Sequence, residues 1–135
     1  MDYFDTDVLI NAFVLQNINR HEESIAFIEQ SIFKDSFLVS WITIQEVGFV
    51  LGKLRQDYSY TTLKIKQLIT STPVSHSRQE FDRAIHLASI IGYSNFNDCL
   101  HLAIAERYCK NLYTYNRSDF SKLIDHTILK IKILE

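Results

Sequence analysis

Strand-length apolar segments alternate with helical patterns along this chain, and nothing between them has the sequence of a hairpin turn. We expect strands over residues 2–5, 37–40, 112–115 and 128–134, with a brief one at 72–75. Apolar residues recur at helical intervals between them, over 8–16, 22–33, 42–55, 60–71, 78–92 and 96–109. Strands that are joined through helices, without Asn-Gly or Asp-Gly turns, run parallel with right-handed crossovers. The sequence therefore predicts an α/β protein, a three-layer α/β/α sandwich with a mainly parallel central sheet.

The length and charge of the chain limit what this fold can do. The 135 residues suffice for one hydrophobic core of ordinary size, so we expect residues 1–135 to form a single domain. A formal net charge of -2 argues against a purely electrostatic nucleic-acid binder, although it leaves room for a local basic surface. Only three glycines are present and none forms a phosphate-binding motif, which excludes the common nucleotide loops.

The cysteines and the amino terminus indicate a cytoplasmic protein. Cys99 and Cys109 fall on one predicted helix, where they lie roughly 15 Å apart and beyond the reach of a disulfide. Free buried thiols are typical of a reducing compartment. The start of the chain, MDYFDTD, lacks the basic and apolar regions of a signal peptide, and no apolar run is long enough to span a membrane. We therefore expect no membrane association.

Acidic and amide residues gather where the predicted strands end. Asp5 closes the first strand, and Asn116 and Asp119 follow directly after the strand LYTY. Asp98 stands near the start of a helix in the second half of the chain. Because ligands of such sheets bind outside the carboxyl ends of the strands, we expect these groups to share one edge.

Asp98 and Glu46 each have a plain structural explanation when they are taken alone. Asp98 sits beside Asn97 in a first helical turn, where capping favours both side chains. Glu46 lies on an apolar helix face with no basic residue three or four positions away, which suits a helix margin as well as a polar site. Together with Asp5 and Asp119, however, these acids repel one another unless a cation neutralises them. Oxygen ligands suit Mg²⁺ or Mn²⁺, so the set indicates metal-assisted chemistry on a phosphodiester.

Four successive segments resemble the signatures of the PIN-domain family, and most of all its VapC-type toxin branch. They are FDTDVLI at the amino terminus, VSWITIQEV around Glu46, FNDCLHLAIAE around Asp98 and LYTYNRSDF around Asp119. The resemblance covers essentially the whole chain in the right order and implies a PIN-like fold. It also implies a Mg²⁺- or Mn²⁺-dependent endoribonuclease that cuts RNA by water attack. As implied partners it adds a second copy of the chain, in a homodimer, and the small antitoxin of a toxin-antitoxin pair.

The resemblance assigns roles to single residues. The acids that match the family's catalytic and metal-binding positions are Asp5, Glu46, Asp98 and Asp119. The polar groups expected to support them are Thr6, Asn116, Thr114 and Ser40. Many relatives carry an Asp in place of Asn116, and an amide is a neutral and weaker ligand. We therefore expect chemistry with a single metal ion.

Basic and aromatic residues near these acids are candidates for RNA contact. Arg117 lies inside the segment YNRSDF, and Lys53 and Arg55 follow Glu46 in the same helical segment. Further candidates are Lys64, Lys66 and Tyr60 on the next predicted helix and Tyr58 just before it. A solvated surface explains any one of the basic residues, and a protein interface explains the tyrosines equally well.

Two aromatic side chains close to the acids are expected to be structural. We expect Trp41 to belong to the core. His101 lies one turn after Asp98, but imidazole suits zinc better than magnesium, so we expect a packed histidine or one that supports the acids.

Two other functions stay open on the sequence alone. Asp5-Thr6-Asp7-Val8 also fits the pattern of haloacid-dehalogenase-like phosphatases, with Asp5 as the nucleophile and Asp7 as the general acid and base. That reading leaves Glu46 without a role and lacks a convincing lysine. The second alternative is a non-catalytic PIN-fold module that binds RNA or a protein, which Asn116 favours and the intact acids disfavour.

Overall fold

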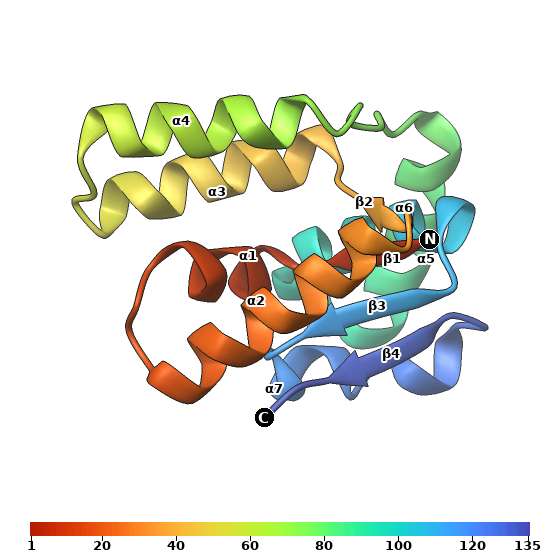
Figure 1. Ribbon diagram of the computed structural model, residues 1–135. Helices are drawn as coiled ribbons and strands as arrows, with labels where there is room; N and C mark the ends of the chain where they lie inside the picture. The colour runs from red at the N-terminus through yellow and green to blue at the C-terminus, as the bar shows by residue number, and fades with distance from the viewer.

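The computed structural model describes residues 1–135 and contains a parallel four-stranded sheet between two layers of helices (Figure 1). The strands are β1 (Asp2–Phe4), β2 (Phe37–Leu38), β3 (Asn111–Thr114) and β4 (Lys130–Ile133). Their order in the sheet is β2-β1-β3-β4, and every neighbouring pair is parallel. The predicted fold class is confirmed. The strand expected at 72–75 is reduced to one bridge between Val74 and Ser40.

Seven α-helices connect and cover the strands. They are α1 (Thr6–Phe13), α2 (Ile18–Phe33), α3 (Trp41–Lys53), α4 (Tyr58–Ile69), α5 (Arg78–Ile91), α6 (Phe96–Tyr108) and the short α7 (Arg117–Phe120). The 3-10 turns η1 (Tyr93–Asn95) and η2 (Ile124–His126) precede α6 and β4. In Figure 1, α3 and α4 form a hairpin along one side of the molecule. The six longer helices were expected from the sequence, whereas α7 was not.

Alternate residues of the strands belong to two different cores, one on each face of the sheet. The core beneath α5 and α6 receives Tyr3, Leu38 and Leu112. The core beneath α1, α3 and α4 receives Phe4, Val39 and Tyr113. Full burial of one such large side chain stabilises the fold by roughly 1.5–3 kcal/mol. The sheet is therefore held from both faces, and the ends of its strands are fixed in position.

The ends of α5 show how local sequence sets helix boundaries. Ser77 and Glu80 form a capping box at its start, in which the Glu80 carboxylate accepts a hydrogen bond from the Ser77 backbone. Gly92 ends the helix with a φ of 108°, a conformation that favours glycine, as its place after the last apolar residue predicts. Each boundary follows from a residue type that meets a backbone requirement.

Two local expectations were wrong. Asn97 does not cap α6, because the helix begins at Phe96 with Asn95 before it, and Asp98 is already inside the first turn. Trp41 is 44% exposed and not a core residue, since it is the first residue of α3 and Ser40 takes the inward position beside it.

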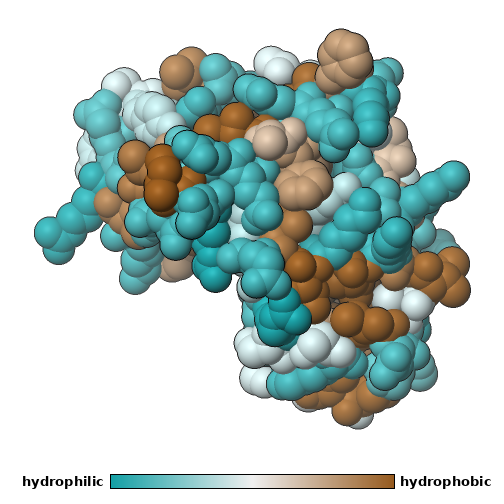
Figure 2. Space-filling view, turned by 60° about the horizontal axis from the view of Figure 1, so that its bottom comes forward, coloured by the Kyte–Doolittle hydropathy of each residue, from teal (hydrophilic) through white to brown (hydrophobic).

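The remaining general features agree with expectation. β4 is the partly exposed edge strand, and both cysteines are free. No helix combines the length and the apolar character that crossing a membrane requires. On the face shown in Figure 2, hydrophobic side chains gather in separate patches among hydrophilic ones.

Candidate active site at the carboxyl edge of the sheet

A cavity of about 450 Å³ opens where the carboxyl ends of β1 and β3 lie side by side. The chain leaves β1 toward β2 on one side and reaches β3 on the other, so the crossovers diverge and leave a crevice at this point. The polar lining of the cavity includes Asp5, Thr6, Asp7, Glu46, Asp98 and Asn116. Three of the four predicted acids therefore meet in one place.

Asp5 is the most deeply placed of these acids. It follows β1 directly and caps α1, where its Oδ1 accepts a hydrogen bond from the Thr6 backbone N–H at 2.8 Å. Its Oδ2 accepts the Thr114 hydroxyl at 2.8 Å, which ties the end of β1 to the end of β3. Burial raises the pKa of Asp5, although His101 and these hydrogen bonds oppose the increase. Asp5 is thus held rigidly between two strands.

Glu46 projects from α3 and is surrounded by hydrogen-bond donors. His101 Nε2 lies 3.0 and 2.9 Å from its two carboxylate oxygens, and the Thr6 hydroxyl lies 2.5 Å from Oε2. Burial acts against its charge, but the contacts with His101 and Thr6 outweigh burial and lower the pKa of Glu46. This acid is therefore ionised and fixed in orientation.

Asp98 differs from the other acids because its carboxylate forms neither a hydrogen bond nor an ion pair with any side chain. Burial, followed by the negative charges of Asp5 and Asp119, raises its pKa to about 7. Its position in the first turn of α6 favours a negative charge, but this effect of the helix dipole is the smaller one. Asp98 is thus a carboxylate whose charge lacks a partner.

Asp119 does not line the cavity, although its charge reaches Asp98. The Asn116 amide donates to Asp119 Oδ2 at 2.9 Å, and Lys122 lies 3.9 Å from Oδ1. Asn116 also caps α7, because its Oδ1 accepts the Asp119 backbone N–H at 3.3 Å and the Ser118 hydroxyl at 3.0 Å. The Asn116 side chain therefore stabilises the short helix that carries Asp119.

Asp7 also lines the cavity, although only the phosphatase alternative assigned it a role. Its carboxylate accepts the Tyr115 backbone N–H at 3.3 and 3.2 Å and so anchors the loop after β3. Burial, and next the charge of Asp5, raise the pKa of Asp7 to about 7. The signal was present in FDTD, where a second acid follows Asp5 within two residues.

A buried polar chain lies behind Glu46, in which His101 and Ser40 were expected as packed or supporting groups, whereas Tyr3 and Thr43 were missed. His101 is only 1% exposed, and its Nδ1 lies 2.6 Å from the Tyr3 hydroxyl. Tyr3 in turn contacts Ser40 Oγ at 2.8 Å and Thr43 Oγ1 at 3.0 Å. Because a carboxylate only accepts hydrogen bonds, His101 Nε2 must carry the hydrogen that points at Glu46. Ser40 therefore reaches the site through Tyr3 and His101 and does not line it.

The three candidate RNA-binding residues are not in the cavity. Arg117 pairs with Glu135 at 3.2 Å and belongs to α7. Lys53 ends α3 with its Nζ over the ring of Phe49, and Arg55 is exposed in the following turn with a φ of 56°. None of the three lines the cavity, but Phe49, which contacts Lys53, does.

The donor set fits a hard divalent cation. No three acidic, histidine or cysteine side chains are arranged as a closed cage for an ion. Mg²⁺ usually takes one or two carboxylates and completes its shell with waters and substrate phosphates, so an open arrangement suits it. Asp98 offers unshared oxygens, and Asp5 lies close enough to raise its pKa. A cation at this edge would relieve the repulsion between them.

The comparisons with known proteins agree with this geometry. The family model described as PIN domain matches residues 3–124, so the chain belongs to the PIN-domain family. Domains of this family bind RNA, are usually nucleases and generally use divalent metals. No curated protein matches the chain. The family match supports the PIN interpretation over the phosphatase alternative.

Proposed function

We propose that this protein is a divalent-metal-dependent endoribonuclease of the VapC type, which hydrolyses phosphodiester bonds of RNA at the acidic cavity. The observation that carries the proposal is Asp98, a carboxylate without a partner beside Asp5 and within reach of Asp119. A protein that only binds RNA gains nothing from gathered negative charge, because such charge repels phosphate. A metal-assisted hydrolase needs it.

Each acid has a distinct part in this proposal. Asp5 and Asp98 would hold Mg²⁺ or Mn²⁺, with Glu46 oriented toward the same space by His101 and Thr6. The bound ion would lower the pKa of a water molecule and stabilise the charge that develops on the leaving oxygen. Asp119, on α7 after β3 and near enough for its charge to raise the pKa of Asp98, would complete the site or orient the attacking water. A single ion is proposed, since Asn116 is occupied as a cap.

The cellular role in the proposal follows from the resemblance to VapC-type toxins. We include a toxin-antitoxin role, a small antitoxin protein, a homodimer and a cytoplasmic location, with residues 1–135 acting as one PIN-like domain. The two free cysteines suit a reducing compartment. Sedimentation velocity tests the dimer, and growth on induction of the wild type against Asp98→Asn tests toxicity.

The decisive experiment is cleavage of pooled, end-labelled RNA with Mg²⁺ or Mn²⁺ and with EDTA. We expect metal-dependent cuts by the wild type and at least a hundredfold slower cleavage by Asp98→Asn, because a ligand is lost at the reacting centre. Asp82→Asn, an exposed acid on α5, is the matched control and should cut like the wild type. Folded wild-type protein that cuts no RNA with either metal would contradict the proposal and leave a non-catalytic binding module.

A further inference from the structure

Phe49 is the anomalous residue of the acidic cavity. It lines the cavity, yet its side chain is 65% exposed, whereas the other apolar lining residues, Ile10 and Val50, are buried or half-buried. An exposed aromatic ring beside several carboxylates is not buried in the hydrophobic core, and it cannot donate a hydrogen bond to the acids. A planar apolar ring at the mouth of a charged site is well suited to contact a planar ligand group.

A lysine accompanies this ring. Lys53 Nζ lies 5.4 Å from the centroid of Phe49, within cation-π distance, and no carboxylate lies within ion-pair distance of it. Glu46, Phe49 and Lys53 are spaced by three and four residues along α3, so they share one helix face. An acid, a ring and a cation thus follow one another from the cavity outward.

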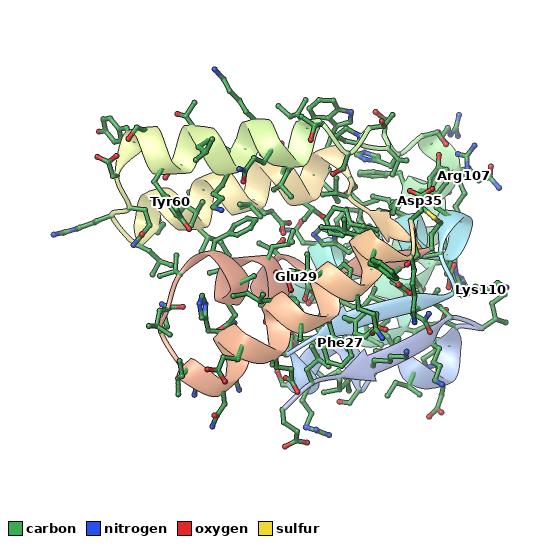
Figure 3. The ribbon with its side chains drawn as sticks, in the orientation of Figure 1. Phe27, Glu29, Asp35, Tyr60, Arg107 and Lys110 are labelled. Carbon is green, nitrogen blue, oxygen red and sulfur yellow. The ribbon has the colours of Figure 1, made fainter.

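A second aromatic and lysine pair lies on the helices next to α3. Lys64 Nζ is 5.2 Å from the centroid of Phe13 and 5.4 Å from that of Tyr60. The Tyr60 hydroxyl donates to the Phe13 carbonyl, which joins the first turn of α4 to the end of α1. Figure 3 labels Tyr60 near the turn of the α3–α4 hairpin. In Figure 1 the end of α1 and the turn of the α3–α4 hairpin lie at the same end of the molecule. Two lysines that lie over aromatic rings are therefore found at the same end of the fold.

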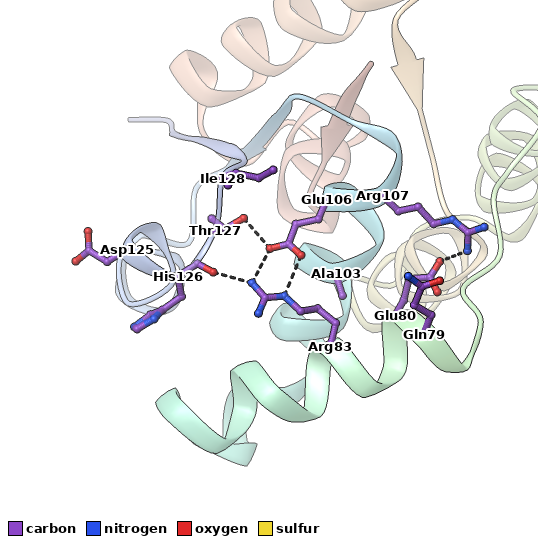
Figure 4. Close-up of a pocket in the computed structure, with 10 residues that line it drawn as sticks. All are labelled: Gln79, Glu80, Arg83, Ala103, Glu106, Arg107, Asp125, His126, Thr127 and Ile128. Carbon is purple, nitrogen blue, oxygen red and sulfur yellow. Dashed lines mark hydrogen bonds and ion pairs between the residues drawn. The ribbon is translucent and has the colours of Figure 1, made fainter.

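The larger cavity of the molecule offers no comparable site. It has a volume of about 740 Å³, but both of its arginines are already paired with glutamates, as Figure 4 shows. Arg83 binds Glu106 through two contacts of 3.0 Å, and Arg107 pairs with Glu80. A ligand there would have to displace these pairs. At the acidic cavity, by contrast, Phe49 is exposed, and Lys53 beside it has no carboxylate within ion-pair distance.

We propose that Phe49 and Lys53 form a nucleotide subsite, in which the ring stacks on an unpaired base next to the scissile phosphate and Lys53 binds a neighbouring phosphate. The inference rests on the proposed nuclease function. A nucleotide is the ligand that brings a flat π surface and an anion together, and therefore matches a ring beside an unpaired cation. Phe49 has no hydrogen-bonding group, so the subsite accepts any base but requires its face to be exposed, which a duplex prevents.

The test is equilibrium binding in EDTA, where a metal-dependent enzyme does not cut. Fluorescence anisotropy would follow a short labelled single-stranded RNA and the same strand annealed to its complement. We expect Phe49→Ala and Phe49→Leu to bind the single strand about tenfold more weakly, because both lose a stacking face, and Phe49→Trp to bind like the wild type. Lys53→Ala should lower the slope of log affinity against log salt by about 0.7, the loss of one phosphate contact.

The matched control is Phe33→Ala. Phe33 is 92% exposed but ends α2 just before β2, at the opposite edge of the sheet, so its removal should leave RNA binding unchanged. Unchanged binding by Phe49→Ala would overturn the inference and leave the ring as a contact for a protein. Wild-type binding by Phe49→Leu would also overturn it, because apolar bulk would then suffice.

The outcomes separate this inference from the proposed activity. If the wild type cuts RNA and Phe49→Ala cuts it with the same KM, the nuclease function stands and the subsite is refuted. If Phe49→Ala and Phe49→Leu lose binding in EDTA while Phe49→Trp keeps it and no form cuts RNA, the subsite stands and the nuclease function is refuted.

Discussion

At the scale of single residues, Glu46 depends on the histidine behind it. His101 donates to both of its oxygens from a fully buried position and is itself held by Tyr3. Groups that orient metal-binding carboxylates typically change metal affinity or activity by 10- to 100-fold, so we expect a loss of this size in His101→Leu. His101→Gln keeps an N–H near the position of Nε2 and should recover most of the activity. The measurement is kcat for RNA cleavage, with urea unfolding of each variant.

A purely structural histidine would give a different result. Both substitutions would then lower the free energy of unfolding, and folded His101→Leu and His101→Gln would cleave equally. Equal kcat values for the two variants would therefore contradict a role for His101 in orienting Glu46.

The sequence predicted acids at this edge far better than it predicted their partners. Asp5 and Asp119 follow strands, and the end of a strand can be located from its apolar pattern. The contact of His101 with Glu46 joins residues that lie 55 positions apart in the sequence and on two different helices. A local sequence pattern cannot predict a contact between such distant positions. For the same reason, the unpartnered state of Asp98 became visible only in the structure.

At the scale of secondary structure, the start of α5 carries a testable pH dependence. Glu80 is buried, and burial would raise its pKa, but hydrogen bonds from Ser77 and Arg107 outweigh burial and lower the pKa to about 2. A lowered folded-state pKa gives stability that is fully present above the unfolded value, 4.5, and is lost as the pH falls toward 2. We therefore expect Glu80→Gln to lower the free energy of unfolding by about 1 to 2 kcal/mol near neutral pH, and by less in acid.

Urea unfolding of both proteins near neutral pH and near pH 3 measures this difference. Glu29→Gln, an exposed acid on α2, is the control and should match the wild type at both pH values. A deficit in Glu80→Gln that stayed the same in acid would show that the lost interaction does not depend on the charge of Glu80.

Most helices could be predicted because their ends carry the required residue types, such as Ser77 and Gly92 around α5. Two elements were not predicted correctly: a strand was expected at 72–75, and α7 was not expected. Each error has a local cause. Pro73 has no N–H for a sheet hydrogen bond, so the segment around Val74 makes one bridge and no strand. α7 has only four residues, too few for a helical period, and it exists because Asn116 caps it.

At the scale of the whole molecule, parallel strands could be predicted but their order could not. The absence of hairpin turns fixes the direction of the strands, whereas any neighbour of β1 is compatible with helical crossovers. The order β2-β1-β3-β4 places β3 beside β1 and so brings Thr114 to Asp5 and the loop after β3 to Asp7. The site is thus a consequence of an arrangement that only tertiary packing decides.

Repulsion between the acids of the cavity should lower the free energy of unfolding of the metal-free protein. Asp98→Asn removes a charge that Asp5 and Asp119 repel, while the lost interaction with the helix dipole costs only about 0.5 kcal/mol. In EDTA above neutral pH we expect this variant to exceed the wild type by about 1 kcal/mol in the free energy of unfolding.

Mg²⁺ or Mn²⁺ at ten times its Kd should then stabilise the wild type by about 1.4 kcal/mol and leave the variant unchanged. Thermal unfolding measures both effects, and Asp82→Asn should respond to metal like the wild type. Asp98→Asn that is less stable than the wild type in EDTA would mean that the carboxylate serves the fold, and that the repulsion is already compensated within the protein.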